Sequence, residues 1–144
     1  MTDSKRHNPS TVSAVPPAFS AIYSHAVEIP PDTRLLLISG QIGVAPDGTV
    51  LSGFRAQCAQ AMANVEALLA AAALRPVDMV KVIYYLTSAA DLPVLTAMRQ
   101  EHWASSNPPA VTTLVIAALA RPELLIEIDV TAAARVSAGS RVDG

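Results

Sequence analysis

The sequence predicts a single α+β domain in which a β-sheet packs against two helices. The chain has 144 residues, the usual length of one domain. Short runs rich in β-branched residues alternate with two longer segments whose apolar residues recur at helical spacing. The composition is 51% hydrophobic and only 15% charged, which leaves less polar surface than a solitary subunit normally exposes. This apolar surplus favours a homo-oligomer.

The expected elements follow the order ββαβαββ, beginning with two strands. Residues 21–29 and 34–39 are predicted to be strands joined by a turn, because a Pro-Pro-Asp sequence separates them. Residues 40–52 are predicted to form a loop with a tight Asp-Gly turn at positions 47–48.

The next three elements are two helices with a strand between them. Apolar residues at helical spacing predict a helix of about five turns over residues 54–72, ended by the proline at position 76. Residues 79–87 are β-branched and aromatic, which predicts a strand. Asp91 is a suitable cap for the second helix, and the Asn-Pro-Pro sequence at 107–109 stops it.

Two strands, at residues 110–118 and 124–133, complete the expected fold. In the second of these, Glu127 and Asp129 share one face because side chains alternate along a strand. Two helices cover only one face of such a sheet, so we expect another subunit on the other face.

The chain ends and composition predict a cytoplasmic protein of one domain. We expect a flexible leader at residues 1–18, the domain at 19–135 and a flexible tail at 136–144. The longest apolar run, residues 67–74, is too short to span a membrane, and no secretory signal is apparent. The net charge is −2 with scattered Lys and Arg residues, which disfavours nucleic acid as a partner.

Several short motifs occur in an order that resembles the RidA (YjgF) family of reactive intermediate deaminases over residues 19–135. They are Tyr23, Ser39-Gly40-Gln41-Ile42, Gln60 with Asn64-Val65, Asp78 with Val80-Lys81, Pro109-Ala110 and Ile126-Glu127-Ile128. The resemblance implies a chorismate-mutase-like fold and a homotrimer with a small-molecule cleft at each subunit interface. It also implies hydrolysis of enamines and imines to ketones and ammonia, without metal or cofactor.

The resemblance also implies a set of site residues. Glu127 would be catalytic, and the substrate-binding residues would be Tyr23, Gly40, Thr96 (where an asparagine is usual), Val111, Thr112 and Thr113. Imine hydrolysis needs a positioned water and a proton source, and a carboxylate provides both. Each residue also has a structural interpretation: Glu127 as a solvated strand residue, Tyr23 as interface packing, and the two threonines as ordinary strand residues, one of which must point away.

Val111 departs from the family pattern, because deaminating members have an arginine there that binds the substrate carboxylate. Losing such a contact costs about 1.5–3 kcal/mol of binding free energy. We therefore expect a substrate that is neutral or less acidic than an amino-acid imine. Alternatively, Arg99 or Arg121 supplies the positive charge from another direction.

Other residues and functions remain as alternatives. The replacement of the usual arginine by Val111 and of the usual asparagine by Thr96 supports a non-catalytic trimer of the same fold that binds a small molecule or acts in regulation. Ribonuclease activity fits poorly with the acidic charge balance. His25 and His102 are interpreted as packing residues, Cys58 as a buried apolar residue, and no His, Cys or acidic residues show metal-ligand spacing.

Overall fold

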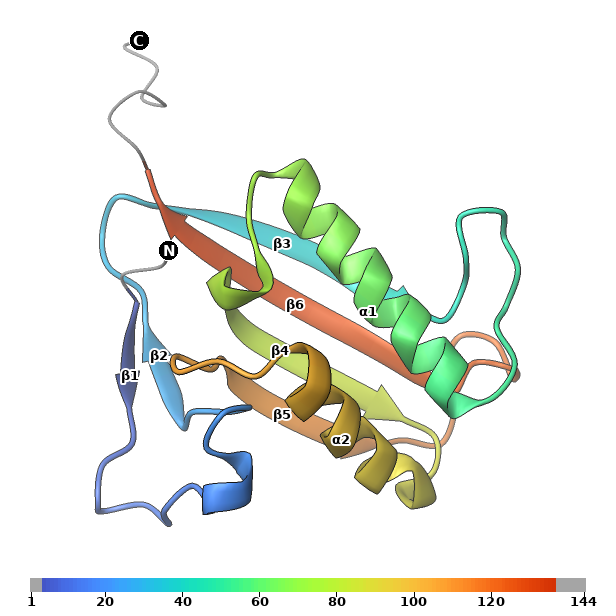
Figure 1. Ribbon diagram of the computed structural model, residues 1–144, viewed down its shortest axis with the longest axis horizontal. Helices are drawn as coiled ribbons and strands as arrows, with labels where there is room; N and C mark the ends of the chain where they lie inside the picture. The colour runs from blue at the N-terminus through green and yellow to red at the C-terminus, as the bar shows by residue number, and fades with distance from the viewer. Residues whose placement is uncertain (1–3, 137–144) are drawn as a thin grey trace, which may run out of the picture.

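The computed structural model describes residues 4–136 and has two layers, in which two helices pack on one face of a four-stranded sheet (Figure 1). The helices are α1 (Phe54–Ala71) and α2 (Leu92–His102). The strands of this sheet, in spatial order, are β3 (Thr33–Ile42), β6 (Ile126–Arg135), β4 (Met79–Leu86) and β5 (Ala110–Val115). Two short strands, β1 (Lys5–His7) and β2 (Ala26–Glu28), form a separate pair, and short 3₁₀ helices lie at Pro17–Phe19, Pro76–Asp78 and Ala89–Asp91. The predicted α+β class is confirmed.

The long strands pair mainly antiparallel. β3 and β4 each pair antiparallel with β6, whereas β5 pairs parallel with β4. A parallel pair requires a crossover connection, and α2 provides it between β4 and β5. The predicted order of two strands, helix, strand, helix and two strands is therefore present from β2 to β6, with β1 before it.

The N-terminal segment differs from the prediction. Part of the expected leader forms β1, and β2 pairs with β1 rather than with β3. Ser24 holds this segment against the start of β5: its backbone N–H donates to Pro109 O over 2.9 Å and its hydroxyl donates to Pro108 O over 2.9 Å. Strand pairing is decided by these distant partners, so the turn sequence between β2 and β3 did not reveal it. Residues 137–144 of the expected tail lie outside the described residues.

The boundaries of later elements also differ slightly from the prediction. β5 ends at Val115, and β6 begins at Ile126 and continues to Arg135. Asp91 lies at the N-cap position, just before α2, but its side chain makes no capping hydrogen bond; the Ser88 hydroxyl instead accepts a hydrogen bond from the Ala90 N–H. The Asp-Gly turn is confirmed, with a backbone hydrogen bond from Gly48 to Ala45 and a positive φ of 90° at Gly48.

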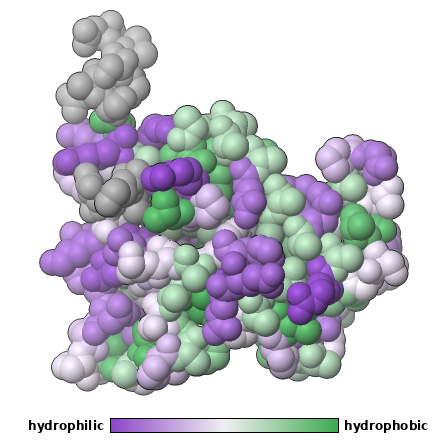
Figure 2. Space-filling view, in the orientation of Figure 1, coloured by the Kyte–Doolittle hydropathy of each residue, from purple (hydrophilic) through white to green (hydrophobic). Residues whose placement is uncertain are grey.

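The core lies between the helices and the inner face of the sheet. Its fully buried side chains come from one face of α1 and from alternate positions of β4 and β6, and they include Cys58, Val65, Leu69, Val82, Leu86, Ile126 and Ile128. Neither described helix has the length and apolar character required to cross a membrane. On the helix-covered side, hydrophilic and hydrophobic residues are intermixed over the surface (Figure 2).

The outer face of the sheet carries no helix. The registers place Leu35 and Leu37 on this face with Glu127, and the two leucines are 56% and 75% exposed. Exposed leucines side by side on a sheet are typical of an interface with another subunit. The uncovered face predicted from the element order is therefore present in the described residues.

Two side-chain amides on α1, the buried Gln57 and the half-buried Asn64, hold loops near the sheet edge. Gln57 donates to Leu51 O over 3.0 Å and to Glu123 O over 2.9 Å, and it accepts from the Leu125 N–H over 2.8 Å. Asn64 donates to Ile42 O and Val44 O, both over 3.1 Å. These bonds fix the chain after β3 and the chain before β6.

We predict that Gln57→Leu lowers the free energy of unfolding by about 2–4 kcal/mol, because it leaves buried backbone groups without partners. Urea denaturation monitored by circular dichroism measures this change. Gln100 is a matched control, since it is exposed and donates to Ala18 O. Gln100→Leu should change stability by less than about 0.5 kcal/mol. Equal effects of the two variants would contradict this account.

Candidate functional site

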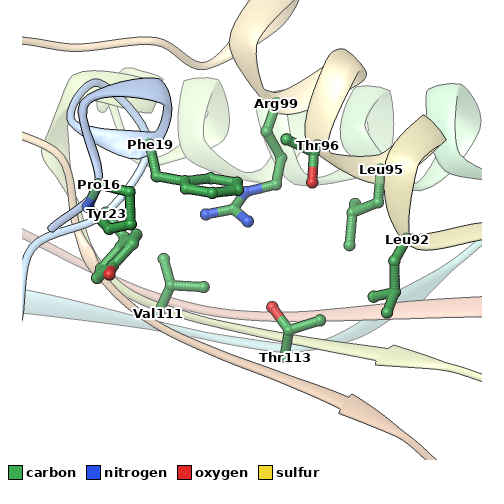
Figure 3. Close-up of a pocket in the computed structure, with 9 residues that line it drawn as sticks. All are labelled: Pro16, Phe19, Tyr23, Leu92, Leu95, Thr96, Arg99, Val111 and Thr113. Atoms are coloured by element: carbon green, nitrogen blue, oxygen red, sulfur yellow. The ribbon is translucent and has the colours of Figure 1, made fainter. Parts of the chain in front are cut away.

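A cleft of about 420 Å³ lies between α2, β5 and the segment that precedes β2. Figure 3 shows its residues from three directions: Leu92, Leu95, Thr96 and Arg99 from α2, Val111 and Thr113 from β5, and Pro16, Phe19 and Tyr23 from the N-terminal segment. Most of the lining is apolar, and it includes no acidic side chain. Such a cleft with a few polar groups is typical of a small-molecule site.

Local structure explains why these side chains converge. The four α2 residues are spaced i, i+3, i+4 and i+7, which places them on one face of the helix. On β5, Val111 and Thr113 pair with Val82 and Tyr84 of β4, two residues that face the core, so they point toward the helices. The hydroxyls of Thr96 and Thr113 point into the cleft from opposite walls (Figure 3).

Tyr23 is held in place by neighbouring rings. Its ring centroid lies 6.5 Å from that of Phe19, and the His25 ring meets it edge-on with a centroid distance of 5.8 Å. His25 is also fixed at its Nε2 by the Ser13 carbonyl, at 2.6 Å. The histidine therefore packs against the tyrosine at the margin of the cleft, in agreement with a packing role.

Arg99 places a positive charge in the cleft. Its side chain is only 6% exposed; Nη2 donates to Ile22 O over 2.9 Å, and Cζ lies 4.8 Å from the centroid of the Tyr84 ring. Burial lowers the pKa of the Arg99 guanidinium from its ordinary value and raises the pKa of the Tyr84 phenol. Arginine remains charged despite such a shift, so this is a buried cation.

Arg121, the other arginine considered as a substitute for the missing charge, does not line this cleft. Its side chain is exposed and lies 3.9 Å from the Glu123 carboxylate. Of the two alternatives, only Arg99 presents its guanidinium to the space beside Val111.

The seven residues predicted for the site fall into two groups within one chain. Tyr23, Thr96, Val111 and Thr113 line the cleft. Gly40, Thr112 and Glu127 lie on the other side of the sheet, because neighbouring residues on a strand point to opposite faces. The expectation that Val111 and Glu127 face one hollow is therefore not met by a single subunit.

Gly40 and Glu127 are close neighbours on the outer face. A Cβ placed on Gly40 would lie 2.6 Å from Glu127 Cδ and would overlap the carboxylate. The strand register shifts between Ile38 and Gln41, next to this glycine. Glycine at this position therefore allows the half-buried Glu127 side chain to lie over the backbone of β3.

Thr112 has a partner within the chain, because Lys81 Nζ donates to its hydroxyl over 3.0 Å. Thr113, not Thr112, is the β5 threonine that faces the cleft. No three His, Cys, Asp or Glu side chains lie together as a metal site in the part of the chain that the structure describes.

Sequence reasoning missed several walls of the cleft. Pro16 and Phe19 belong to or border the segment expected to be a flexible leader, and only the fold places them beside α2. Arg99 was named only as one of two candidates for the missing charge, although its position gave a further signal, since it interrupts the apolar face formed by Leu92 and Leu95. A charged residue on the apolar face of a helix is a candidate for binding.

Comparisons with known proteins agree with this geometry. The family model described as Endoribonuclease L-PSP matches residues 13–134. A RutC family protein of Aquifex aeolicus is 36% identical over 109 residues, covering 74% of this chain and 85% of that protein. The chain belongs to the RidA (YjgF) family.

Two solved structures of Rid proteins support the fold. The Rid family protein YyfB of Yersinia pestis, whose function is described as unknown, superposes with a TM-score of 0.78 at 34% identity, covering 90% of this chain and 98% of that one. RidA of an Antarctic Psychrobacter species has a TM-score of 0.64 at 32% identity, covering 76% and 86%. The chorismate-mutase-like architecture inferred from the motifs therefore matches structures of the RidA family.

We predict that Cys58 does not react as a nucleophile in the folded protein. It is fully buried in the core, and burial raises the pKa of its thiol to about 12. Since the thiolate is the reactive form, a disulfide reagent at pH 8 should modify the native protein only at the rate of unfolding. Addition of urea should expose the thiol and release one equivalent of product. Rapid labelling of the native protein at pH 8 would contradict the burial of this side chain.

Proposed function

We propose that this protein is a Rid-type hydrolase that deaminates a small enamine or imine in clefts between the subunits of a homotrimer. One observation carries the proposal: the residues that the family resemblance assigns to the site, with Val111 and Thr96 at the substituted positions, lie on two faces of the sheet. Tyr23, Thr113 and their neighbours form the cleft, whereas Glu127 and Gly40 lie on the uncovered face. A complete site therefore requires the cleft of one subunit and the outer face of another.

The exposed leucines of the outer face support such an assembly. Burying Leu35 and Leu37 in a subunit interface removes apolar surface from water, at about 25 cal/mol per Å². In an oligomer with closed cyclic symmetry, every subunit buries this face against a neighbouring subunit. The same packing would bring Glu127 of one copy toward the cleft of the next.

The proposed chemistry is general acid–base catalysis by Glu127. The carboxylate takes a proton from a water whose oxygen attacks the imine carbon, and the nitrogen gains a proton. The resulting carbinolamine loses ammonia as the C–N bond breaks, and the hydroxyl becomes the ketone. The reaction needs only water and one carboxyl group that alternately accepts and donates a proton. Val111 offers no charge where deaminating relatives have arginine, so we expect the substrate to be bound differently.

A non-catalytic binding role is the alternative for the same cleft. Val111 and Thr96 support it, because both replace polar or charged side chains that contact substrate in deaminating members. Retention of a small molecule in native mass spectrometry, with no turnover of any imine, would favour this alternative.

We predict that the protein accelerates ketone release from small imines, and that Glu127→Gln lowers kcat/KM by about 100-fold or more. Imines with and without a carboxylate should be generated in place, by an amino-acid oxidase and an amine oxidase respectively, and the carbonyl product trapped and measured. Asp129→Asn is the matched control, since Asp129 is on the same strand and face and is also half-buried. This variant should retain most of the activity. Unchanged turnover in Glu127→Gln would contradict the proposed role.

We predict that Leu37→Glu dissociates the trimer into single subunits and abolishes turnover, because a carboxylate is costly to bury in an apolar interface. Sedimentation velocity measures the change in mass. Leu68→Glu is the control: Leu68 is 40% exposed on α1, on the helix-covered side of the sheet. That variant should remain trimeric. A native chain that sediments as one subunit would refute the assembly.

A further inference from the structure

Arg99 is a buried cation whose partners in the described chain carry no formal charge. Only 6% of the residue is exposed; its Nη2 donates to the Ile22 carbonyl and its guanidinium lies over the Tyr84 ring, with Tyr23 also nearby. Within residues 4–136, it forms no salt bridge with any carboxylate. Buried arginines are nearly always paired with an anion, because removing a charge from water is costly. The positive charge at this wall of the cleft is thus uncompensated.

The orientation of the guanidinium suits an incoming anion. One of its five N–H donors is used by Ile22, and Tyr84 covers one face of the group. Figure 3 shows the guanidinium extending into the cleft, beneath Phe19 and across from Val111. Within one subunit none of the lining side chains is acidic, so an anion beside Arg99 meets no like charge from its own chain. Thr96, three residues before Arg99 and on the same face of the helix, adds a hydroxyl to the cleft.

The apolar part of the cleft limits the kind of anion. Leu92, Leu95 and Val111 lie beyond the guanidinium, so a fully hydrated or multiply charged ion would lose solvation without polar partners there. A ligand with one charged end and a short hydrocarbon part matches both regions. Planar carboxylates also fit the paired N–H donors of arginine.

We propose that Arg99 binds the carboxylate of a small monocarboxylic substrate, whose hydrocarbon part lies against Leu95 and Val111. This inference rests on the proposed function and adds the class of substrate. It favours the alternative in which Arg99 supplies the charge over the expectation of a neutral substrate, which followed from the loss of arginine at position 111. The positive charge is supplied by α2 instead of β5, so the substrate is held from the opposite wall of the cleft.

The test compares butanoate with butanamide, two probes of similar size that differ in charge. Their dissociation constants for the full-length protein are measured by NMR titration. We expect butanoate to bind about 10- to 100-fold more tightly than butanamide, as for a charged hydrogen bond made away from water. Arg99→Met should remove this preference, and Arg99→Lys should retain part of it. Arg121→Met is the control and should leave the preference unchanged, because Arg121 lies outside the cleft.

Several outcomes would overturn the inference. Equal binding of butanoate and butanamide by the native protein would contradict the role of Arg99, and this result does not depend on whether Arg99→Met folds. A preference for butanoate that survives in a folded Arg99→Met protein would also contradict it. Turnover of imines is measured separately: hydrolysis of neutral imines as fast as carboxylated ones would leave the proposed function intact and refute the role of Arg99. Conversely, a preference for butanoate without turnover of any imine would support anion binding by Arg99 and contradict the proposed hydrolase activity.

Discussion

Side chains alternate between the two faces of a β-strand, and in this protein helices cover only one of those faces. The inner face provides Val111 and Thr113 to a cleft under α2, whereas the outer face presents Glu127 beside Gly40. This constraint divides the residues that the family resemblance assigns to a site into two groups, one on each face of the subunit. The uncovered, leucine-bearing face and the separation of these groups are therefore two consequences of the same arrangement.

The cleft depends on contacts that hold irregular segments against the regular layers. Ser24 ties the N-terminal segment to the start of β5, which places Tyr23 beside the strand. Gln57 and Asn64 satisfy the backbone of the chain around the β3 and β6 ends, which fixes the surroundings of Gly40 and Glu127. Buried side-chain amides suit this task because each one satisfies several backbone groups at once.

The positive charge in the cleft comes from Arg99 on α2, whereas the facing position on β5 is Val111. A guanidinium in this low-dielectric setting interacts with an anion more strongly than it would in water, while its burial against Tyr84 limits its freedom to move. The direction from which the charge acts then distinguishes this protein from relatives with arginine on the strand.

Local patterns in the sequence were sufficient for most of the fold. Helical spacing predicted α1, β-branched runs predicted β4 and β6, and the ordered motifs identified the family, because each signal depends on nearby residues. Tertiary structure decided the rest: that β2 pairs with β1, that Pro16 and Phe19 form a wall of the cleft, and that Arg99 rather than Arg121 reaches it. Those outcomes depend on contacts between residues far apart in the chain, and local propensity carries no information about such partners.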